Sequence, residues 1–500
     1  MRLFLLLGLL LTASALSAQT CADPLRYKSA IFPTAATTDI VYGNAQAIPL
    51  VYVNENVTVA QDLTMDIWQP LNDTVSQRPL LIMAFGGGFI IGSKEDADVT
   101  AVCDSFARKG FVTASINYRK GLDITNDDSA ERAVYRATQD WSAAIRWFRE
   151  YPDSFRIHPD HIYIGGVSAG GFGALHAQYT TDADRPASTF AQGLPFARPD
   201  LGCIDCSGNS FNHSRKAKAL INLWGAIGDT NWVENSDSVP LLAFHGTDDL
   251  IVPYGYGFPF TAIITLPQVY GSSLIAERAA NIGLQHQFVS FQGVGHNIWG
   301  TVVNNAWGPN SPSQYQEGIL TDMRDFLWPF LKPVTDPVSG DVTPQLFVPT
   351  TYSVPFRPGY RWCWDAGPDG VVQAVPNQPN MVTVTWTAAG QRQVVARPVN
   401  EVEALGEPDS LQVNVLAVSR EEESFPGQVK VYPQPSEDAL HVYKDFPQAM
   451  DWRLLGMRGE VVDKGKWRGN ELVVEGLAAG LYLIECRLGD ALWSQKVLVR

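Results

Sequence analysis

The chain has 500 residues, of which 45% are hydrophobic and 18% are charged, and its formal net charge is −15 at pH 7. This length exceeds that of one ordinary domain of roughly 100–200 residues, and the composition is that of a chain that buries a sizeable core. An acidic chain without a block of lysine and arginine is not expected to bind nucleic acid or an anionic membrane surface.

The first residues are typical of a secretory signal peptide, which we expect to span residues 1–18. Arg2 supplies a positive charge, an apolar run follows, and small residues lead up to Ala15 and Ala18. The run is shorter than the about 20 residues that cross a bilayer. We therefore expect cleavage after Ala18 or Ala15, and no transmembrane segment in the mature chain.

Strand-like and helix-like stretches alternate from residue 63 to residue 331, which predicts an α/β fold with a mostly parallel sheet and helices on both faces. The expected strands, of which the first two are continuous apolar runs, are 79–85, 111–118, 161–165, 219–224, 241–245 and 287–291. Apolar residues recur at helical spacing between 130 and 149, and a helix of small residues is expected from Ala169.

Helical periodicity disappears beyond this α/β domain, which we assign to residues 19–333. Residues 334–344 are rich in Pro, Asp, Val and Gly and predict a linker. Short β segments then predict two small all-β sandwich domains, one over 345–419 and one over 427–500, with a Glu-rich break between them.

Six cysteines are present, and an exported chain can retain disulfide bonds. Cys203 and Cys206 lie in a Gly/Asn/Ser-rich loop, where a local disulfide or inert thiols are the favoured interpretations. A redox-active pair would need a thioredoxin-like βαβ context, which the flanking sequence lacks. A zinc site would need two further ligands, and His213 alone does not supply them.

The segment Gly166-Val167-Ser168-Ala169-Gly170 follows an expected strand and opens an expected helix. A serine on such a tight turn has strained backbone angles and is pushed out of the sheet as a nucleophile. The residues two before and two after it must be very small, and glycines, Gly166 and Gly170, stand at these two positions. A flexible glycine loop is the alternative, but this strand–helix context favours a nucleophilic Ser168.

A glycine run, Gly86-Gly87-Gly88, follows the first buried strand, upstream of Ser168. Such a loop can supply backbone N–H groups to a developing oxyanion without obstruction by side chains. We assign this role to Gly87, Gly88 and the N–H of Ala169. A phosphate-binding loop is the alternative, but no Lys or Ser/Thr follows at the required spacing.

A nucleophilic serine needs a base and an acid that orients it, expected in the order serine, acid, histidine. The last two expected strands are followed by Asp248-Asp249 and by His296. We assign His296 as the base and Asp249, in preference to Asp248, as the acid. His245 ends its strand too early to reach Ser168 and is expected to brace the acid loop. The histidines excluded by position are His158, His161, His176 and His441.

These motifs together resemble those of α/β-hydrolase carboxylesterases over roughly residues 40–333. The matching pieces are LIMAFGGGFIIG, AAIRWFRE, IYIGGVSAGGFGA, HGTDDLIVP and GVGHN, and they are most similar to the secreted acetyl/feruloyl-esterase-like branch and to type B carboxylesterases. Many relatives carry His before the three glycines, where this chain has Phe85. We therefore expect the residues that support the glycine loop to differ from those in these relatives.

The two β domains carry resemblances of their own. The middle domain, with Tyr360-Arg-Trp362 and VTVTW, resembles PKD-like sandwiches. The last domain is similar to the C-terminal sorting domain of type IX secretion, through VKVYPQP, GLAAGLYLI and the ending KVLVR. That resemblance implies contact with the secretion machinery, removal of the tail, and release or attachment to the outer cell surface.

The carboxylesterase resemblance implies a serine ester hydrolase that needs no metal or organic cofactor, with acetyl or feruloyl esters of polysaccharide as substrates. Phe89 and Trp224, at expected strand ends, are candidates for lining the substrate pocket or for the core. A general lipase or carboxylesterase for small esters is the alternative. A peptidase is disfavoured because no propeller-like repeats precede the domain. A non-catalytic binding module is disfavoured because the serine, acid and histidine are all present.

Overall fold

The structure is a computed structural model that describes residues 21–49, 55–193, 197–236, 238–261, 263–417, 427–432, 436, 439–489 and 491–500. The predicted signal peptide, residues 1–18, lies outside the described residues. The chain divides into two compact units, Met1–Val342 with Pro349–Thr385 and Gln391–Val413, and Thr343–Val348 with Trp386–Gly390 and Asn414–Arg500. The prediction of three separate domains stays a prediction.

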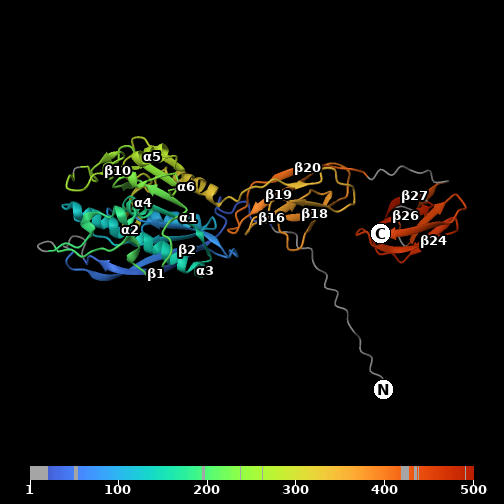
Figure 1. Ribbon diagram of the computed structural model, residues 1–500, viewed down its shortest axis with the longest axis horizontal. Helices are drawn as coiled ribbons and strands as arrows, with labels where there is room; N and C mark the ends of the chain where they lie inside the picture. Colours follow the sequence, from blue (N-terminus) through green and yellow to red (C-terminus); the bar gives the residue numbers. More distant parts are fainter. Residues whose placement is uncertain are drawn as a thin grey trace, which may run out of the picture. The chain divides into compact units, whose positions relative to one another are not determined.

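An eight-stranded sheet forms the centre of the first unit, in the order β1-β2-β4-β3-β5-β6-β8-β11. Figure 1 labels its edge strands β1 and β2. The bounds of the strands are β1 Thr34–Ala47, β2 Val59–Pro70, β3 Arg78–Ala84, β4 Val112–Ile116, β5 Ile157–Val167, β6 Ala219–Leu223, β8 Leu241–Gly246 and β11 His286–Phe291. From β4 to β11 all neighbours are parallel, whereas β1 and β2 add an antiparallel edge. The sheet confirms the α/β-hydrolase fold.

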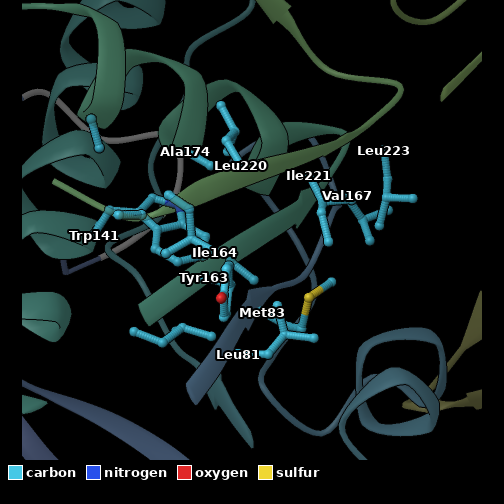
Figure 2. Close-up of a cluster of buried hydrophobic side chains, with 14 of the residues drawn as sticks. Leu81, Met83, Trp141, Tyr163, Ile164, Val167, Ala174, Leu220, Ile221 and Leu223 are labelled. Atoms are coloured by element: carbon cyan, nitrogen blue, oxygen red, sulfur yellow. The ribbon is translucent and has the colours of Figure 1, made fainter. Parts of the chain in front are cut away.

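The parallel strands carry apolar side chains on both faces because helices cover them. Every residue of β3, β4, β6 and β8 is buried. The bounds of the helices are α1 Ala97–Ala107, α2 Asp127–Glu150, α3 Pro152–Phe155, α4 Ala169–Tyr179, α5 Ser272–Asn281 and α6 Gln316–Leu331. Figure 2 draws part of this core, where side chains of β3, β5 and β6 gather with Trp141 of α2 and Ala174 of α4.

The edge strands β1 and β2 were not among the expected strands. Their residues alternate between buried and exposed environments over part of their length, as in a sheet edge that faces solvent. Smaller elements of the same unit are β7 Ala226–Ile227, β9 Tyr256–Gly257, β10 Val269–Gly271, β12 Val302–Val303, β13 Ala306–Trp307 and the 3-10 turns Asp182–Asp184, Ala187–Thr189, Ile204–Cys206 and Thr230–Trp232.

Two antiparallel sheets follow the α/β part of the chain, in the orders β14-β15-β18-β17 and β16-β19-β20. Their bounds are β14 Ser339–Gly340, β15 Thr350–Ser353, β16 Arg361–Asp365, β17 Gly370–Ala374, β18 Met381–Trp386, β19 Gly390–Val399 and β20 Asp409–Val415. The predicted linker 334–344 contains β14, which pairs with β15.

The turn after β19 is embedded in the α/β core. Val402 and Ala404 are fully buried there, and the Tyr27 hydroxyl donates to the carbonyl of Val402 at 2.5 Å. A disulfide between Cys21 and Cys363 of β16 adds a covalent link that we did not predict. These contacts explain why most of the middle sheets belong to the first unit.

The last part of the chain forms two antiparallel sheets, β21-β22-β25 and β24-β23-β26-β27. Their bounds are β21 Val429–Val431, β22 Ala439–Lys444, β23 Met450–Leu455, β24 Val461–Trp467, β25 Glu471–Glu475, β26 Gly480–Leu488 and β27 Ala491–Val499. Their buried side chains form a separate core that includes Leu440, Leu454, Trp467 and Ile484. None of the helices in the described ranges has the length and apolarity needed to cross a membrane.

Candidate active site

Ser168 occupies the single turn between β5, which ends at Val167, and α4, which begins at Ala169. Its backbone is strained, with φ 51° and ψ −114°. A Cβ on Gly166 would lie 2.2 Å from the carbonyl carbon of Gly170, and one on Gly170 would lie 2.4 Å from the oxygen of Ala84. The two glycines are therefore required sterically, and the turn presents Ser168 at the end of the sheet.

His296 and Asp249 complete a hydrogen-bonded chain with Ser168. His296 Nε2 lies 2.9 Å from Ser168 Oγ, and His296 Nδ1 lies 2.7 Å from Asp249 Oδ2. Both residues belong to loops that follow parallel strands, Asp249 after β8 and His296 after β11. The sequence interval to Ser168 is large, but neighbouring parallel strands end at the same edge of the sheet and bring the three side chains together.

Asp249 is held as a carboxylate. Burial by itself raises its pKa, but hydrogen bonds from His245 and His296 outweigh burial and hold the pKa below its ordinary value. The second oxygen accepts the backbone N–H groups of Ile251 and Val252, at 2.8 and 2.9 Å. These bonds fix the carboxylate, and its Oδ2 accepts from His296 Nδ1 while His245 Nε2 lies 3.2 Å from the same oxygen. Nε2 of His296 therefore carries the lone pair that faces Ser168.

The alternative acid and the bracing histidine are placed as the sequence predicts. Asp248 is exposed and accepts a hydrogen bond from its neighbour Thr247. His245 is fully buried, and its Nε2 lies 3.2 Å from Asp249 Oδ2 while its Nδ1 meets Ser272 Oγ at 2.7 Å. His245 therefore supports the acid and makes no contact with Ser168.

The glycine loop lies against the serine turn. Gly87 and Gly88 have φ of +100° and +60°, and a Cβ on Gly86 would lie 3.3 Å from Ser168 Cβ. Neither N–H of Gly87 or Gly88 has an acceptor among the described residues, and Ala169, as the first residue of α4, has an N–H without an intrahelical partner. The glycine loop and the start of α4 thus offer three backbone donors for which the described residues supply no acceptor.

Tyr118 supports the start of the glycine loop. Its hydroxyl donates to the carbonyls of Phe85 and Gly86, at 3.1 and 3.2 Å. The Phe85 ring stacks on the Tyr118 ring, with centroids 4.4 Å apart. The glycine loop is therefore supported by the stacked rings of Phe85 and Tyr118 and by the Tyr118 hydroxyl, which donates to two carbonyl groups. We did not predict this support from the sequence.

Two cavities meet at Ser168. The apolar cavity has a volume of about 370 Å³, and its lining includes Phe89, Leu122, Val134, Phe172, His176 and Trp232. The second cavity has a volume of about 600 Å³ and a mixed lining. We call it the polar cavity because polar side chains, among them Asp96, Asp98, His296 and Asn297, join apolar ones such as Trp224 and Trp299. Both are of the size that holds a small organic ligand. The candidates Phe89 and Trp224 thus line opposite cavities, and both also pack in the core.

The polar cavity contains a carboxyl group with an unusual pKa. Burial, followed by the nearby charge of Asp96, raises the pKa of Asp98 to about 7. Trp299 packs edge-to-face on Trp224, with centroids 5.0 Å apart. No sequence signal marked Asp98 or Trp299, because only the folding of α1 and of the His296 loop toward one another gathers them.

Cys203 and Cys206 form a disulfide, which agrees with the local bridge favoured above. Cys103 and Cys486 are buried free thiols. In the described part of the chain, no three His, Cys, Asp or Glu side chains gather into a group that could hold a metal ion.

Comparisons with known proteins match two segments of the chain. The BD-FAE family model matches residues 65–228, and the model "Secretion system C-terminal sorting domain" matches residues 430–500. The second match confirms the predicted sorting domain and indicates export, followed by attachment to the cell surface or release. The first covers about a third of the chain, around the serine turn and the glycine loop.

Curated relatives and solved structures extend this similarity. Carboxylesterase 1C of Rattus norvegicus is 30% identical over 146 residues, 28% of this chain and 26% of that protein. Esterase-5B of Drosophila persimilis is 28% identical over 118 residues, 23% of this chain and 21% of that protein. The chain thus spans about a quarter of the length of these relatives. Esterase 2 of Thermogutta terrifontis, phosphorylated by paraoxon, is 23% identical with a TM-score of 0.39, over 59% of this chain and 94% of that one.

Proposed function

We propose that this chain is an exported serine carboxylic-ester hydrolase that acts through an acyl-enzyme. The observation that carries the proposal is the hydrogen-bonded chain from Ser168 Oγ through His296 to Asp249, close to backbone N–H groups for which the described residues offer no acceptor. Nucleophile, base, orienting acid and oxyanion donors are the four parts that acyl transfer to water requires.

In the first half of the reaction, Ser168 Oγ attacks the ester carbonyl carbon while His296 Nε2 takes its proton. The N–H groups of Gly87, Gly88 and Ala169 stabilise the oxyanion that forms. His296 then gives the proton to the leaving alcohol oxygen, and the acyl group stays on Ser168. In the second half, water attacks the acyl-enzyme with His296 again as base, which releases the acid and restores Ser168. Asp249 stabilises the imidazolium throughout.

Acetyl or feruloyl esters of polysaccharide are the proposed substrates. The BD-FAE match over the serine turn supports an ester hydrolase, and the polar groups of the cavity beside His296 suit an alcohol with several hydroxyl groups. The second candidate is a general carboxylesterase for small esters, which the names of the curated relatives favour.

The purified full-length protein tests this proposal against p-nitrophenyl acetate, methyl ferulate and acetylated xylan. We expect turnover of at least one of them, unchanged by EDTA, and a loss in Ser168→Ala on the order of 10⁴–10⁶ in kcat. Ser207→Ala is the matched control, because Ser207 lies in the loop after the 3-10 turn Ile204–Cys206 and lines neither cavity. Ser168→Ala activity within tenfold of the wild type would refute the assignment.

A further inference from the structure

His296 identifies the cavity that receives the alcohol half of an ester. The alcohol oxygen takes its proton from His296 Nε2 as the ester bond breaks. His296 lines the polar cavity and is not among the described residues that line the apolar cavity. The alcohol therefore leaves into the polar cavity, and the side chains that line this cavity are in a position to select it.

Asp98 contributes a buried carboxyl group to the lining of the polar cavity. It lies in the first turn of α1, and only 7% of its surface is exposed. Its Oδ1 accepts the N–H of Val99 at 2.8 Å, and the indole N–H of Trp299 is a further hydrogen-bond donor to the carboxyl group. Trp299 belongs to the loop after β11 that also carries His296. The start of α1 and this loop thus meet on the alcohol side of the site.

The carboxyl group of Asp98 has too few hydrogen bonds to offset its burial. Burial outweighs the donors from Val99 and Trp299, and together with the charge of Asp96 it raises the pKa of Asp98 to about 7. A buried carboxylate that is short of donors gains more from an additional hydrogen bond than a solvated one does, because water does not already supply that bond. A hydroxyl group of the alcohol is a donor that enters this cavity with the ester.

Several further titratable groups lie on this side of the site. Asp96 and Glu95 precede α1, Tyr118 and Lys120 follow β4, and His296 follows β11. Burial holds the pKa of Tyr118 well above its ordinary value, so its hydroxyl group stays neutral. His296 acts in the hydrolysis of every ester. A ratio of rates for two esters therefore cancels the titration of His296 and retains that of Asp98.

We propose that the Asp98 carboxylate accepts a hydrogen bond from a hydroxyl group of the leaving alcohol, so that the selection of hydroxylated alcohols becomes stronger as pH rises. This inference rests on the proposed function and goes beyond it, because it assigns recognition of the alcohol to one residue and makes that recognition depend on pH. Asp98 is then a specificity residue that contacts the alcohol and takes no part in proton transfer at the ester.

The dependence on pH follows from linkage between the proton and the hydroxyl group on Asp98. A hydroxyl donor stabilises the carboxylate more than the neutral carboxyl group, because a charged acceptor forms the stronger hydrogen bond. Binding of the alcohol therefore lowers the pKa of Asp98 from about 7. The affinity for a hydroxylated alcohol then rises with pH up to about 7 and levels off above this value.

Matched pairs of acetate esters isolate the contribution of a single hydroxyl group. 2-Hydroxyethyl, 3-hydroxypropyl and 4-hydroxybutyl acetate are compared with propyl, butyl and pentyl acetate, in which a methyl group replaces the hydroxyl. We expect the ratio of kcat/KM values to favour at least one hydroxylated ester, and this preference to increase by about five- to tenfold between about pH 5 and pH 8, the difference between a neutral and a charged acceptor. A preference that stays constant over this range in every pair would overturn the inference.

Three variants distinguish recognition by Asp98 from a purely structural role. Asp98→Asn keeps the shape of the side chain but cannot ionise, so its preference should not change with pH. Asp96→Asn removes a neighbouring negative charge, so the rise in preference should move to lower pH. Asp104→Asn is the matched control and should behave as the wild type, because Asp104 is a partly exposed residue of α1 that pairs with Arg108 and lines neither cavity. A rise with pH that persists in Asp98→Asn would contradict the proposal.

Binding of free alcohols to Ser168→Ala separates this inference from the proposed function. Trp224 and Trp299 line the polar cavity, so tryptophan fluorescence can follow the binding of butane-1,4-diol and of pentan-1-ol. Binding that favours the diol and strengthens with pH, without turnover of any ester by the wild type, would refute the proposed function alone. Turnover of the esters in ratios that do not change with pH would refute the role of Asp98 alone.

Discussion

At the scale of single residues, two adjacent aspartates illustrate how environment assigns a role. Asp249 is buried and bonded to His296, to His245 and to two backbone N–H groups, whereas Asp248 is exposed. Their side chains are chemically identical. The different roles proposed for them therefore rest on where the turn after β8 points each of them.

Asp249→Asn should lower kcat by about 10⁴, because an amide favours the wrong tautomer of the base. Asp248→Asn is the matched control and should remain within a few-fold of the wild type. Steady-state kinetics on p-nitrophenyl acetate measure both. If the larger loss fell on Asp248→Asn, the acid would have to be reassigned.

His176 gives a second prediction at this scale. Its pKa of about 4 lies below the ordinary value of 6.5 because of burial. The unfolded chain therefore binds more protons between these values, and His176 lowers the free energy of unfolding as pH falls from about 6.5 to about 4. The pKa of Asp98 is raised to about 7, so Asp98 increases the free energy of unfolding as pH falls. The contribution of His176 is therefore measured as a difference between the wild type and a His176 variant.

We expect the Tm of wild type to fall more steeply than that of His176→Gln between pH 7 and pH 4.5. Differential scanning fluorimetry at several pH values measures this difference. Parallel curves for the two proteins would show that His176 is not held neutral by burial.

At the scale of elements, the serine turn and the glycine loop depend on each other. A Cβ on Gly170 would collide with the backbone that follows β3, and Tyr118, just beyond β4, holds the carbonyls of Phe85 and Gly86. The proposed oxyanion donors are therefore positioned by three neighbouring strands of one sheet. A loop supported in this way needs no reorganisation when charge develops on the substrate.

Tyr118→Phe should lower kcat by about tenfold, the effect of losing one buried hydrogen bond, with little change in KM because the oxyanion forms only in the transition state. Tyr42→Phe is the matched control. Tyr42 is also buried and donates to a backbone carbonyl, that of Asn117, but it lines neither cavity. The Tyr42→Phe variant should have a lower free energy of unfolding than the wild type but an unchanged kcat. A larger effect on KM than on kcat in Tyr118→Phe would argue against a role in oxyanion support.

At the scale of the whole molecule, the candidate site and the sorting tail belong to different compact units. Ser168, Asp249 and His296 all lie in the first unit, and the sorting-domain match covers 430–500 in the second. The separate core of the last two sheets is consistent with a tail that directs export and does not shape the site.

A chain that ends at residue 419 should keep kcat/KM for p-nitrophenyl acetate close to the full-length value, yet accumulate in the periplasm of its host. The exported full-length protein should lack residues from about 427 onward, which intact-mass measurement would detect. Normal export of the shortened chain would contradict this, as would loss of activity in a shortened chain that remains folded by circular dichroism.

The amino-acid sequence by itself determined the features that depend on local sterics and periodicity. Glycines two before and two after Ser168 follow from contacts within one turn, and the buried parallel strands follow from runs of apolar residues. The order of Asp249 and His296 after successive strands could be predicted because parallel strands end at one edge. We did not predict the antiparallel edge strands β1 and β2, because half-exposed strands carry a weaker hydrophobic pattern.

Only the tertiary structure determined the contacts between segments that are far apart in the sequence. The disulfide between Cys21 and Cys363, the burial of Val402 in the α/β core and the support of the glycine loop by Tyr118 join residues far apart in sequence. The same holds for the two cavities at Ser168 and for the hydrogen bond of His176 with Gly228. Packing between elements sets these contacts, and no local pattern encodes which side chains will share a cavity.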